Sequence, residues 1–150
     1  MGIKVRRPIK AVFILLFWIG ISAAGRAQPS RSRITVYSVY FGIESIIAVP
    51  CDQFKTQFEK RMDTTVCLAP DTLRAVASFL QHVRFGSHRD HIDTRAQFVF
   101  VDTGGKTTVI CMDRWDICID GQIIRGYPAF YRYLRLLVPK RNTDWRVKRP

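Results

Sequence analysis

The sequence predicts a single α+β domain built on a mainly antiparallel sheet. Segments rich in strand-forming residues mix with segments of helical periodicity, so both kinds of element are expected. Between about residues 96 and 125, three or four strand segments follow one another with no helix between them. Such a β-meander is typical of an α+β domain rather than of a doubly wound parallel sheet. We expect two to three amphipathic helices to pack on the sheet.

The centre of the meander is a predicted hairpin of residues 97–101 and 107–112, both dense in β-branched and aromatic side chains. Gly104 and Gly105 lie between them, and Gly-Gly supplies the positive φ angles of a two-residue turn. That turn sets four facing pairs: Phe100 with Val109, Val99 with Ile110, Phe98 with Cys111 and Gln97 with Met112. Because both faces of this hairpin are apolar, we expect it to lie centrally in the sheet.

A third strand is predicted at residues 117–119, and Asp120-Gly121 predicts a turn into a further short strand at 123–124. A four-residue connection over 113–116 suits the apolar pattern. It sets two facing pairs: Met112 with Ile117 and Cys111 with Cys118.

Two strands and two helices are predicted before the meander. They are a strand at 34–41, a short helix that Asp52 caps and that carries Phe54 and Phe58, a strand at 64–68, and a helix that has Asp71 as its N-cap and runs to about Arg84. The longer helix has an apolar stripe of period 3.6, formed by Leu73, Val76, Ala77, Leu80 and Val83.

A last helix is predicted after the meander. It begins at Pro128, a residue suited to the first helical turn, and Pro139 ends it. Its inner face consists of Phe130, Tyr133, Leu134 and Leu137.

Residues 1–27 have the pattern of a secretory signal peptide. Four basic residues among the first ten precede an uninterrupted apolar core at 11–21, and small residues follow it. Cleavage after Ala24 or after Ala27 satisfies the small-residue preference, and we favour Ala27. The apolar core is shorter than the roughly 18 residues of a spanning helix. We therefore predict export to the periplasm or the extracellular space; the alternative is a membrane anchor at residues 11–24.

Removal of the signal peptide leaves enough residues for one compact domain, which we place at 28–139. All 12 acidic residues but only 19 of the 24 basic ones lie beyond residue 27, so the net charge of the exported chain is +7. Residues 140–150 are predicted to be a basic, disordered tail. The basic charge favours an anionic envelope component or an acidic protein as partner, while export disfavours nucleic acid. Membrane contact is expected only if the N-terminal helix is retained.

Four cysteines, Cys51, Cys67, Cys111 and Cys118, lie beyond the signal peptide. In an oxidising compartment an even number of cysteines favours disulfides. Of the three possible pairings we favour Cys51–Cys67 with Cys111–Cys118, because the strand register brings the second pair face to face. Neither pair has the close spacing of a structural zinc site, and we predict no metal and no cofactor.

The histidines His82, His88 and His91 lie within ten residues of one another. Their spacing matches no metalloenzyme signature, and neighbouring arginines disfavour a bound cation, so we expect a solvated loop. Asp93 and Arg95 precede the central strand, where we expect them to anchor a loop through hydrogen bonds and an ion pair.

A second polar cluster consists of Asp113, Asp116 and Asp120, with Trp115 among them. Paired carboxylates can hydrolyse glycosidic bonds, but acidic residues between strands are more often turn formers. Trp115 is also a candidate ligand contact.

No catalytic constellation stands out in the sequence. We expect a non-catalytic binding or structural module of the periplasm or cell surface. One alternative is a small hydrolase that uses loop carboxylates or the histidines, and another is a membrane-anchored envelope protein with its basic tail at lipid headgroups. The candidate ligand contacts are Arg95, Trp115, Arg132 and Arg135.

Overall fold

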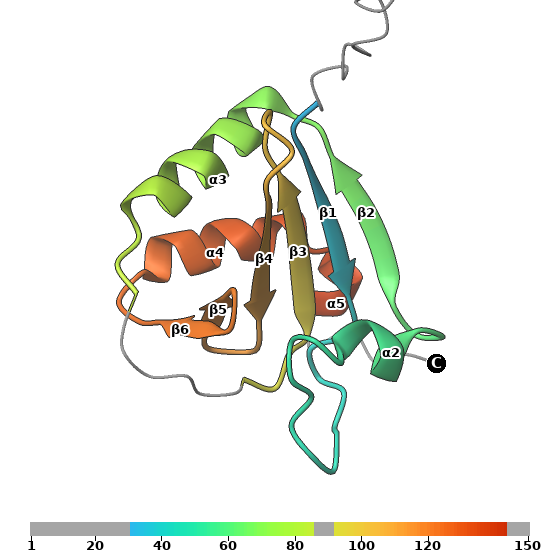
Figure 1. Cartoon of the computed structure of the whole chain (residues 1–150). Coiled ribbons are helices and arrows are strands. Elements are labelled where there is room, and N and C mark those ends of the chain that lie inside the picture. Colours follow the sequence, from blue (N-terminus) through green and yellow to red (C-terminus); the bar gives the residue numbers. More distant parts are fainter. Residues whose placement is uncertain (1–30, 86–91, 144–150) are drawn as a thin grey trace, which may run out of the picture.

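A computed structural model describes residues 31–85 and 92–143 of the chain (Figure 1). The predicted signal peptide at 1–27, as well as His88 and His91, lies outside the described residues. The described elements follow in chain order as β1 (Arg33–Ser38), α2 (Phe54–Phe58), β2 (Asp63–Cys67), α3 (Pro70–His82), β3 (Ala96–Val101), β4 (Thr107–Met112), β5 (Ile117–Ile119), β6 (Gln122–Ile124), α4 (Pro128–Leu137) and α5 (Lys140–Thr143). Among these helices none is both long and apolar enough to cross a membrane.

The six strands form one sheet in the order β2-β1-β3-β4-β5-β6, and every neighbouring pair is antiparallel. This confirms the predicted α+β fold with a mainly antiparallel sheet. The hairpin of β3 and β4 occupies the middle of the sheet, as its two apolar faces predicted.

The predicted register of the β3–β4 hairpin is wrong by one residue. The structure pairs Phe98 with Ile110, Val99 with Val109 and Phe100 with Thr108. The turn holds three residues rather than two, because the Asp102 amide donates to the Lys106 carbonyl (3.0 Å) and the Lys106 amide donates to the Asp102 side chain (2.9 Å). Gly105 has φ +82°, the left-handed conformation that closes a three-residue hairpin loop.

A shift of one residue moves every β4 side chain to the opposite face of the sheet. Ile110 and Met112 therefore join Phe98 in the main core, although the two-glycine turn placed Cys111 beside Phe98. Cys111 instead points to the other face, where it packs with Ile92 and Cys118.

The β4–β5 hairpin has the predicted register. Met112 faces Ile117 and Cys111 faces Cys118 across the four-residue connection. The Asp113 amide closes that connection by donating to the Asp116 carbonyl at 3.1 Å.

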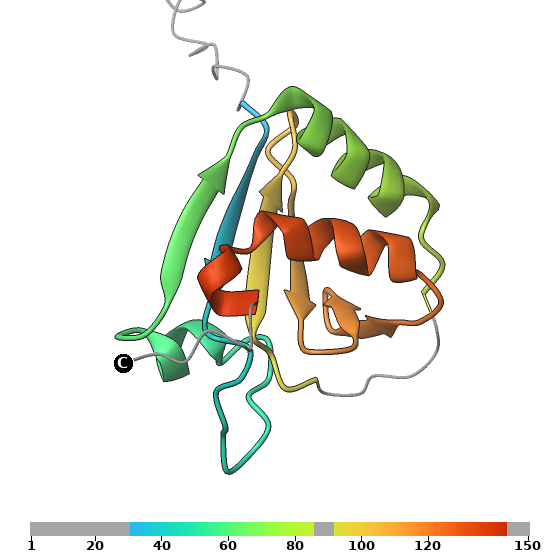
Figure 2. The ribbon, with the colours of Figure 1, turned by 180° about the vertical axis from the view of Figure 1, so that it is seen from behind.

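Helices α3 and α4 cover one face of the sheet, which we call the helix face (Figure 2). Val76 of α3 and Leu134 of α4 are fully buried, and Phe79 stacks on Phe130 where the two helices meet, with ring centroids 3.5 Å apart. Both apolar stripes pack as predicted.

The predicted helix caps at Asp52 and Asp71 are wrong. The N-cap of α2 is Gln53 and that of α3 is Ala69, and neither makes a side-chain capping bond. Pro70 takes the first position of α3 because its fixed φ suits a helix start. Asp71 then lies in the first turn, where a carboxylate interacts favourably with the helix dipole.

The opposite face, which we call the loop face, has no long helix among the described residues. Short helix α2 and the β1–α2 connection cover part of it, with Phe54, Phe58, Val39 and Val49 as a small separate core. These elements gather at the end of the sheet where β1 and β4 finish, which we call the loop end (Figure 1).

The predicted disulfide pairing is wrong, because Cys111 is bonded to Cys51 (Cα–Cα 5.8 Å) while Cys67 and Cys118 are free thiols. Between β4 and β5, backbone hydrogen bonds join the facing residues Asp113 and Asp116 and the facing residues Val109 and Asp120. Facing pairs in an antiparallel ladder alternate between hydrogen-bonded and non-hydrogen-bonded pairs. Cys111 and Cys118 lie two residues from each of these pairs, so they too form a hydrogen-bonded pair. In a hydrogen-bonded pair the two Cβ atoms lie farther apart than the roughly 3.8 Å that separates the Cβ atoms of a disulfide.

Cys67 cannot pair with Cys51 either. Its side chain packs against the core of the helix face, whereas Cys51 belongs to the cluster of the loop face.

The predicted disordered tail does not begin at residue 140. Residues 140–143 form α5, and the buried Asn142 donates to the Ser38 hydroxyl (2.9 Å) and to the Asp63 carboxylate (2.8 Å). Arg141 adds an ion pair to the same carboxylate. Pro139 ends α4 but turns the chain back onto β1 and β2, so the domain extends past residue 139.

Candidate functional site

Two adjoining pockets lie at the loop end of the sheet, between the β1–α2 connection, the β4–β5 loop and the C-terminal helices. Backbone bonds tie these segments together: Phe41 donates to the Asn142 carbonyl (2.7 Å) and Thr94 donates to the Val49 carbonyl (2.9 Å). Side chains from distant parts of the sequence therefore meet at fixed positions.

A buried ion pair supports the β1–α2 connection. Arg95 is 2% exposed, and its two terminal nitrogens bond the carboxylate of Asp93, one of them at 2.7 Å. Arg95 also donates to the Ser45 hydroxyl (3.0 Å), and Asp93 accepts the Val49 amide (2.9 Å). The predicted loop-anchoring role of Asp93 and Arg95 is confirmed.

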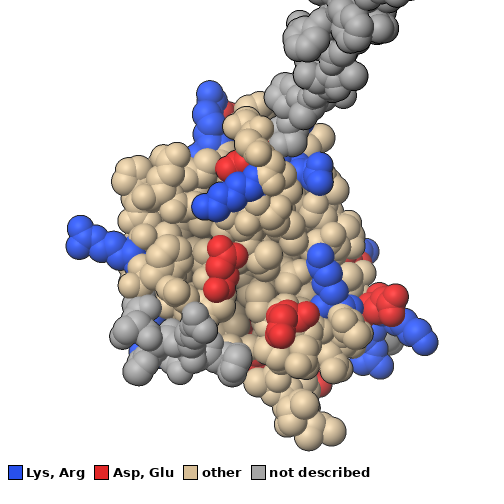
Figure 3. Space-filling model, in the orientation of Figure 1, with Lys and Arg blue, Asp and Glu red and all other residues tan. Residues whose placement is uncertain are grey.

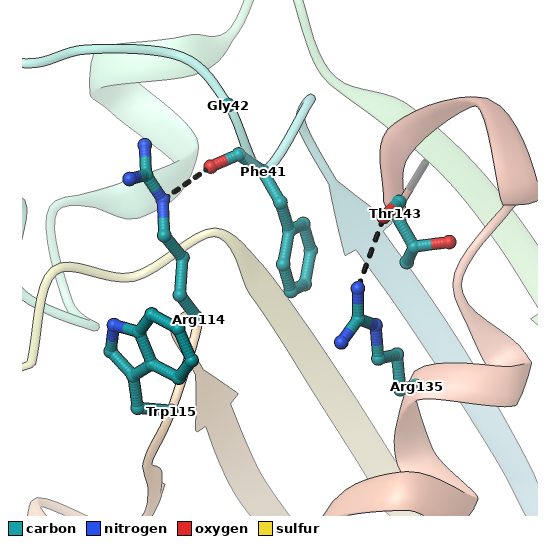
Figure 4. Close-up of a pocket in the computed structure, with 6 residues that line it drawn as sticks. All are labelled: Phe41, Gly42, Arg114, Trp115, Arg135 and Thr143. Carbon is teal, nitrogen blue, oxygen red and sulfur yellow. Dashed lines mark hydrogen bonds between the residues drawn. The ribbon is translucent and has the colours of Figure 1, made fainter. Parts of the chain in front are cut away.

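The first pocket has a volume of about 390 Å³ and joins two aromatic side chains with two guanidinium groups (Figure 4). It is lined by Phe41, Gly42, Arg114, Trp115, Arg135 and Thr143. The ring of Phe41 lies between the side chains of Arg114 and Arg135, which belong to opposite walls of the pocket (Figure 4). Trp115 forms the outer rim and is 81% exposed.

Both arginines of this pocket are held by backbone carbonyls. Nε of Arg114 donates to the Phe41 carbonyl (2.7 Å), and Nη2 of Arg135 donates to the Thr143 carbonyl (3.1 Å). Neither forms an ion pair with a carboxylate in the described part of the chain. Their positive charge is therefore positioned but not neutralised there.

Gly42 in the pocket wall lies close to the end of the Tyr40 side chain. A Cβ atom at this position would lie 2.5 Å from the Tyr40 ring, so that ring would have to move to admit a side chain here.

The β4–β5 loop that carries Arg114 and Trp115 is itself fixed. The Asp113 carboxylate accepts the amides of Trp115 and Asp116, both at 2.6 Å, and the Tyr131 hydroxyl donates to the Arg114 carbonyl at 2.5 Å. Burial raises the pKa of Asp113, and the negative charges of Asp116 and Asp93 add to the shift. Burial also raises the pKa of Tyr131.

The second pocket, of about 430 Å³, shares Arg114 and Trp115 with the first. Its other lining residues come from the β1–α2 connection and the segment before β3: Ile43, Glu44, Ser45, Asp93, Arg95 and Asp113. Carboxylates outnumber arginines here, whereas none of the described residues that line the first pocket is a carboxylate.

The structure brings three of the four candidate ligand contacts to these pockets. Trp115 lines both, Arg135 lines the first and Arg95 lines the second, while the exposed Arg132 lines neither. Sequence reasoning missed Arg114, although it is the neighbour of Trp115. It also missed Phe41 and Thr143, which carry no signal in the sequence and reach the site only through the fold.

The other polar clusters do not converge. Asp120 lies in the β5–β6 turn and bonds the Val109 amide (2.9 Å), at the far end of β5 from Asp113 and Asp116. His82 is exposed and bonds the Ser78 carbonyl within α3. Among the residues that the structure describes, no three histidines, cysteines or carboxylates come together as a metal site.

Comparison of the chain with protein-family models, with curated proteins and with solved structures finds no match. The functional argument therefore depends on the geometry of the two pockets.

Proposed function

We propose that this protein is a small exported binding module and that its first pocket takes the anionic group of a ligand. One observation carries the proposal: Arg114 and Arg135 converge from separate elements on a pocket walled by Phe41 and Trp115, and neither forms an ion pair with a carboxylate among the described residues.

The two kinds of side chain favour different parts of such a ligand. Guanidinium groups bind carboxylates and phosphates through paired hydrogen bonds. The rings of Phe41 and Trp115 favour an apolar or aromatic group beside the anion. A carboxylate or phosphate attached to an apolar body is therefore the ligand chemistry that suits the pocket.

The described part of the loop face shows no broad basic surface. Lysines and arginines lie mostly toward its rim, and acidic residues lie both among them and nearer the middle (Figure 3). We therefore expect an anionic envelope component or an acidic partner to be recognised through a group in the pocket rather than through this face.

Export is proposed from the predicted signal peptide. The Cys51–Cys111 disulfide is compatible with an oxidising compartment. The intact mass of the protein recovered from its natural source tests this part, since cleavage after Ala27 removes 27 residues.

The binding proposal is tested with benzoate and phenyl phosphate as anionic probes and benzamide as the neutral match, by titration calorimetry. Arg135→Gln should weaken the binding of both anions by about tenfold or more, and tenfold is equal to about 1.4 kcal/mol of binding free energy. It should leave the affinity for benzamide unchanged. High salt should also weaken the binding of benzoate and phenyl phosphate, because it screens their attraction to the arginines.

Arg132→Gln is the matched control, because Arg132 is an exposed residue of the same helix that does not line the pocket. Equal binding of benzoate and benzamide, or an equal loss in both variants, would overturn the proposal.

A further inference from the structure

The second pocket continues the first one on the other side of a shared wall. Arg114 and Trp115 line both pockets, which therefore lie next to each other. The combined site is much larger than a single carboxylate or phosphate requires.

Counted over the described residues that line them, the two pockets have opposite net charge. In the second pocket Arg95 forms an ion pair with Asp93, and the other two carboxylates, Glu44 and Asp113, form no ion pair with the shared Arg114 or with any other described residue. Glu44 is exposed and forms no hydrogen bond or ion pair with the described residues. The raised pKa of Asp113 includes a contribution from the neighbouring Asp93 and Asp116, so a cation placed here would relieve repulsion among carboxylates.

We propose that the two pockets form one site for a zwitterionic ligand of the short-peptide class. Its anionic end lies between Arg114 and Arg135, its free ammonium group lies at Glu44 and Asp113, and an apolar part packs on Trp115. This inference rests on the proposed function of the first pocket and adds the cationic end of the ligand.

The test uses the tripeptide Ala-Phe-Ala in three forms: with free ends, with an acetylated N-terminus and with an amidated C-terminus. Titration calorimetry at neutral pH should show that each modification weakens binding by about tenfold. Glu44→Gln should weaken the free peptide to the level of the acetylated one and should not weaken the acetylated peptide further.

Glu59→Gln is the matched control, because Glu59 is an exposed carboxylate at the end of α2 outside both pockets. It should leave all three affinities unchanged.

The outcomes separate the two proposals. Equal binding of the free and acetylated peptides would overturn the zwitterionic site, and loss on amidation alone would leave the anionic pocket standing. Equal binding of the free and amidated peptides would count against the anionic pocket itself. No binding of the free peptide at millimolar concentration overturns the zwitterionic site, and the benzoate titration then decides the first pocket separately.

Discussion

The two faces of the sheet are covered by different means. On the helix face, α3 and α4 bury a continuous core that includes Phe98 and Leu134. On the loop face, small clusters lie beneath irregular segments, and the bond between Cys51 and Cys111 ties the β1–α2 connection to β4. The structure on the helix face is therefore stabilised by buried apolar area, and the structure on the loop face by a disulfide and a buried ion pair.

This difference explains where the candidate site lies. The buried sides of the packed helices leave no room for unneutralised charge, because an unpaired charge in a core is costly. Loops held by a disulfide and by Arg95 can expose arginines and carboxylates at fixed positions. The same connection that lacks regular structure therefore supplies Phe41, Gly42 and Glu44 to the two pockets.

The largest effect is expected from loss of the disulfide. The bond joins residues 60 apart in the sequence, and a loop of this length contributes up to about 4 kcal/mol in the chain-entropy model. The double variant Cys51→Ala with Cys111→Ala should lower the free energy of unfolding by that order in urea denaturation. Cys67→Ala, which removes a free thiol, is the control. A parent protein whose urea midpoint does not change with reductant would contradict this account of the loop face.

The helix face should respond to the loss of packed volume instead. Leu134→Ala removes a fully buried side chain of α4 and should cost about 3 kcal/mol. Leu136→Ala on the same helix should change stability by less than about 0.5 kcal/mol, because Leu136 is 82% exposed. Both values should be the same in the disulfide-free background, since the two sites are separate. Equal losses in the two leucine variants would show that α4 does not pack as described.

The smallest effect concerns the pH dependence of the loop end. Burial raises the pKa of Asp113, so the folded state holds its proton more tightly than the unfolded state does. The resulting stabilisation is present below the usual pKa of Asp and is lost as the pH rises through the folded pKa. Asp113→Asn cannot ionise, and its side-chain oxygen can still accept the two loop amides. Its stability relative to the parent should therefore rise between about pH 3 and about pH 7, as followed by thermal unfolding. A constant difference across this range would contradict the raised pKa.

Local patterns in the sequence were sufficient for the elements and the class of fold. Periodicity predicted α3 and α4 with their buried stripes, and the run of hairpins predicted an antiparallel sheet with β3 and β4 at its centre. These signals are local, because turn residues and apolar spacing act within a few residues of each other.

Some details that failed depend on a local choice between two turns, and others depend on contacts beyond that range. A two-residue and a three-residue turn both accommodate Gly-Gly, and the choice between them decided which face of the sheet Cys111 occupies. That choice in turn decided its disulfide partner. Helix α5 at residues 140–143 was also not predicted. Its Asn142 is held by hydrogen bonds to Ser38 and Asp63, which lie far away in the sequence.

The sequence by itself determined the strands and the two amphipathic helices, since each depends on neighbouring residues. It also indicated that Asp93 and Arg95 anchor a loop, although the residues they hold, Ser45 and Val49, lie far away in the sequence. Only the tertiary structure decided the Cys51–Cys111 bond and the meeting of Phe41, Arg114, Arg135 and Thr143 at one pocket. These residues come from four separate segments, and the packing of α4 and α5 across the end of the sheet is what brings their side chains within reach of one ligand.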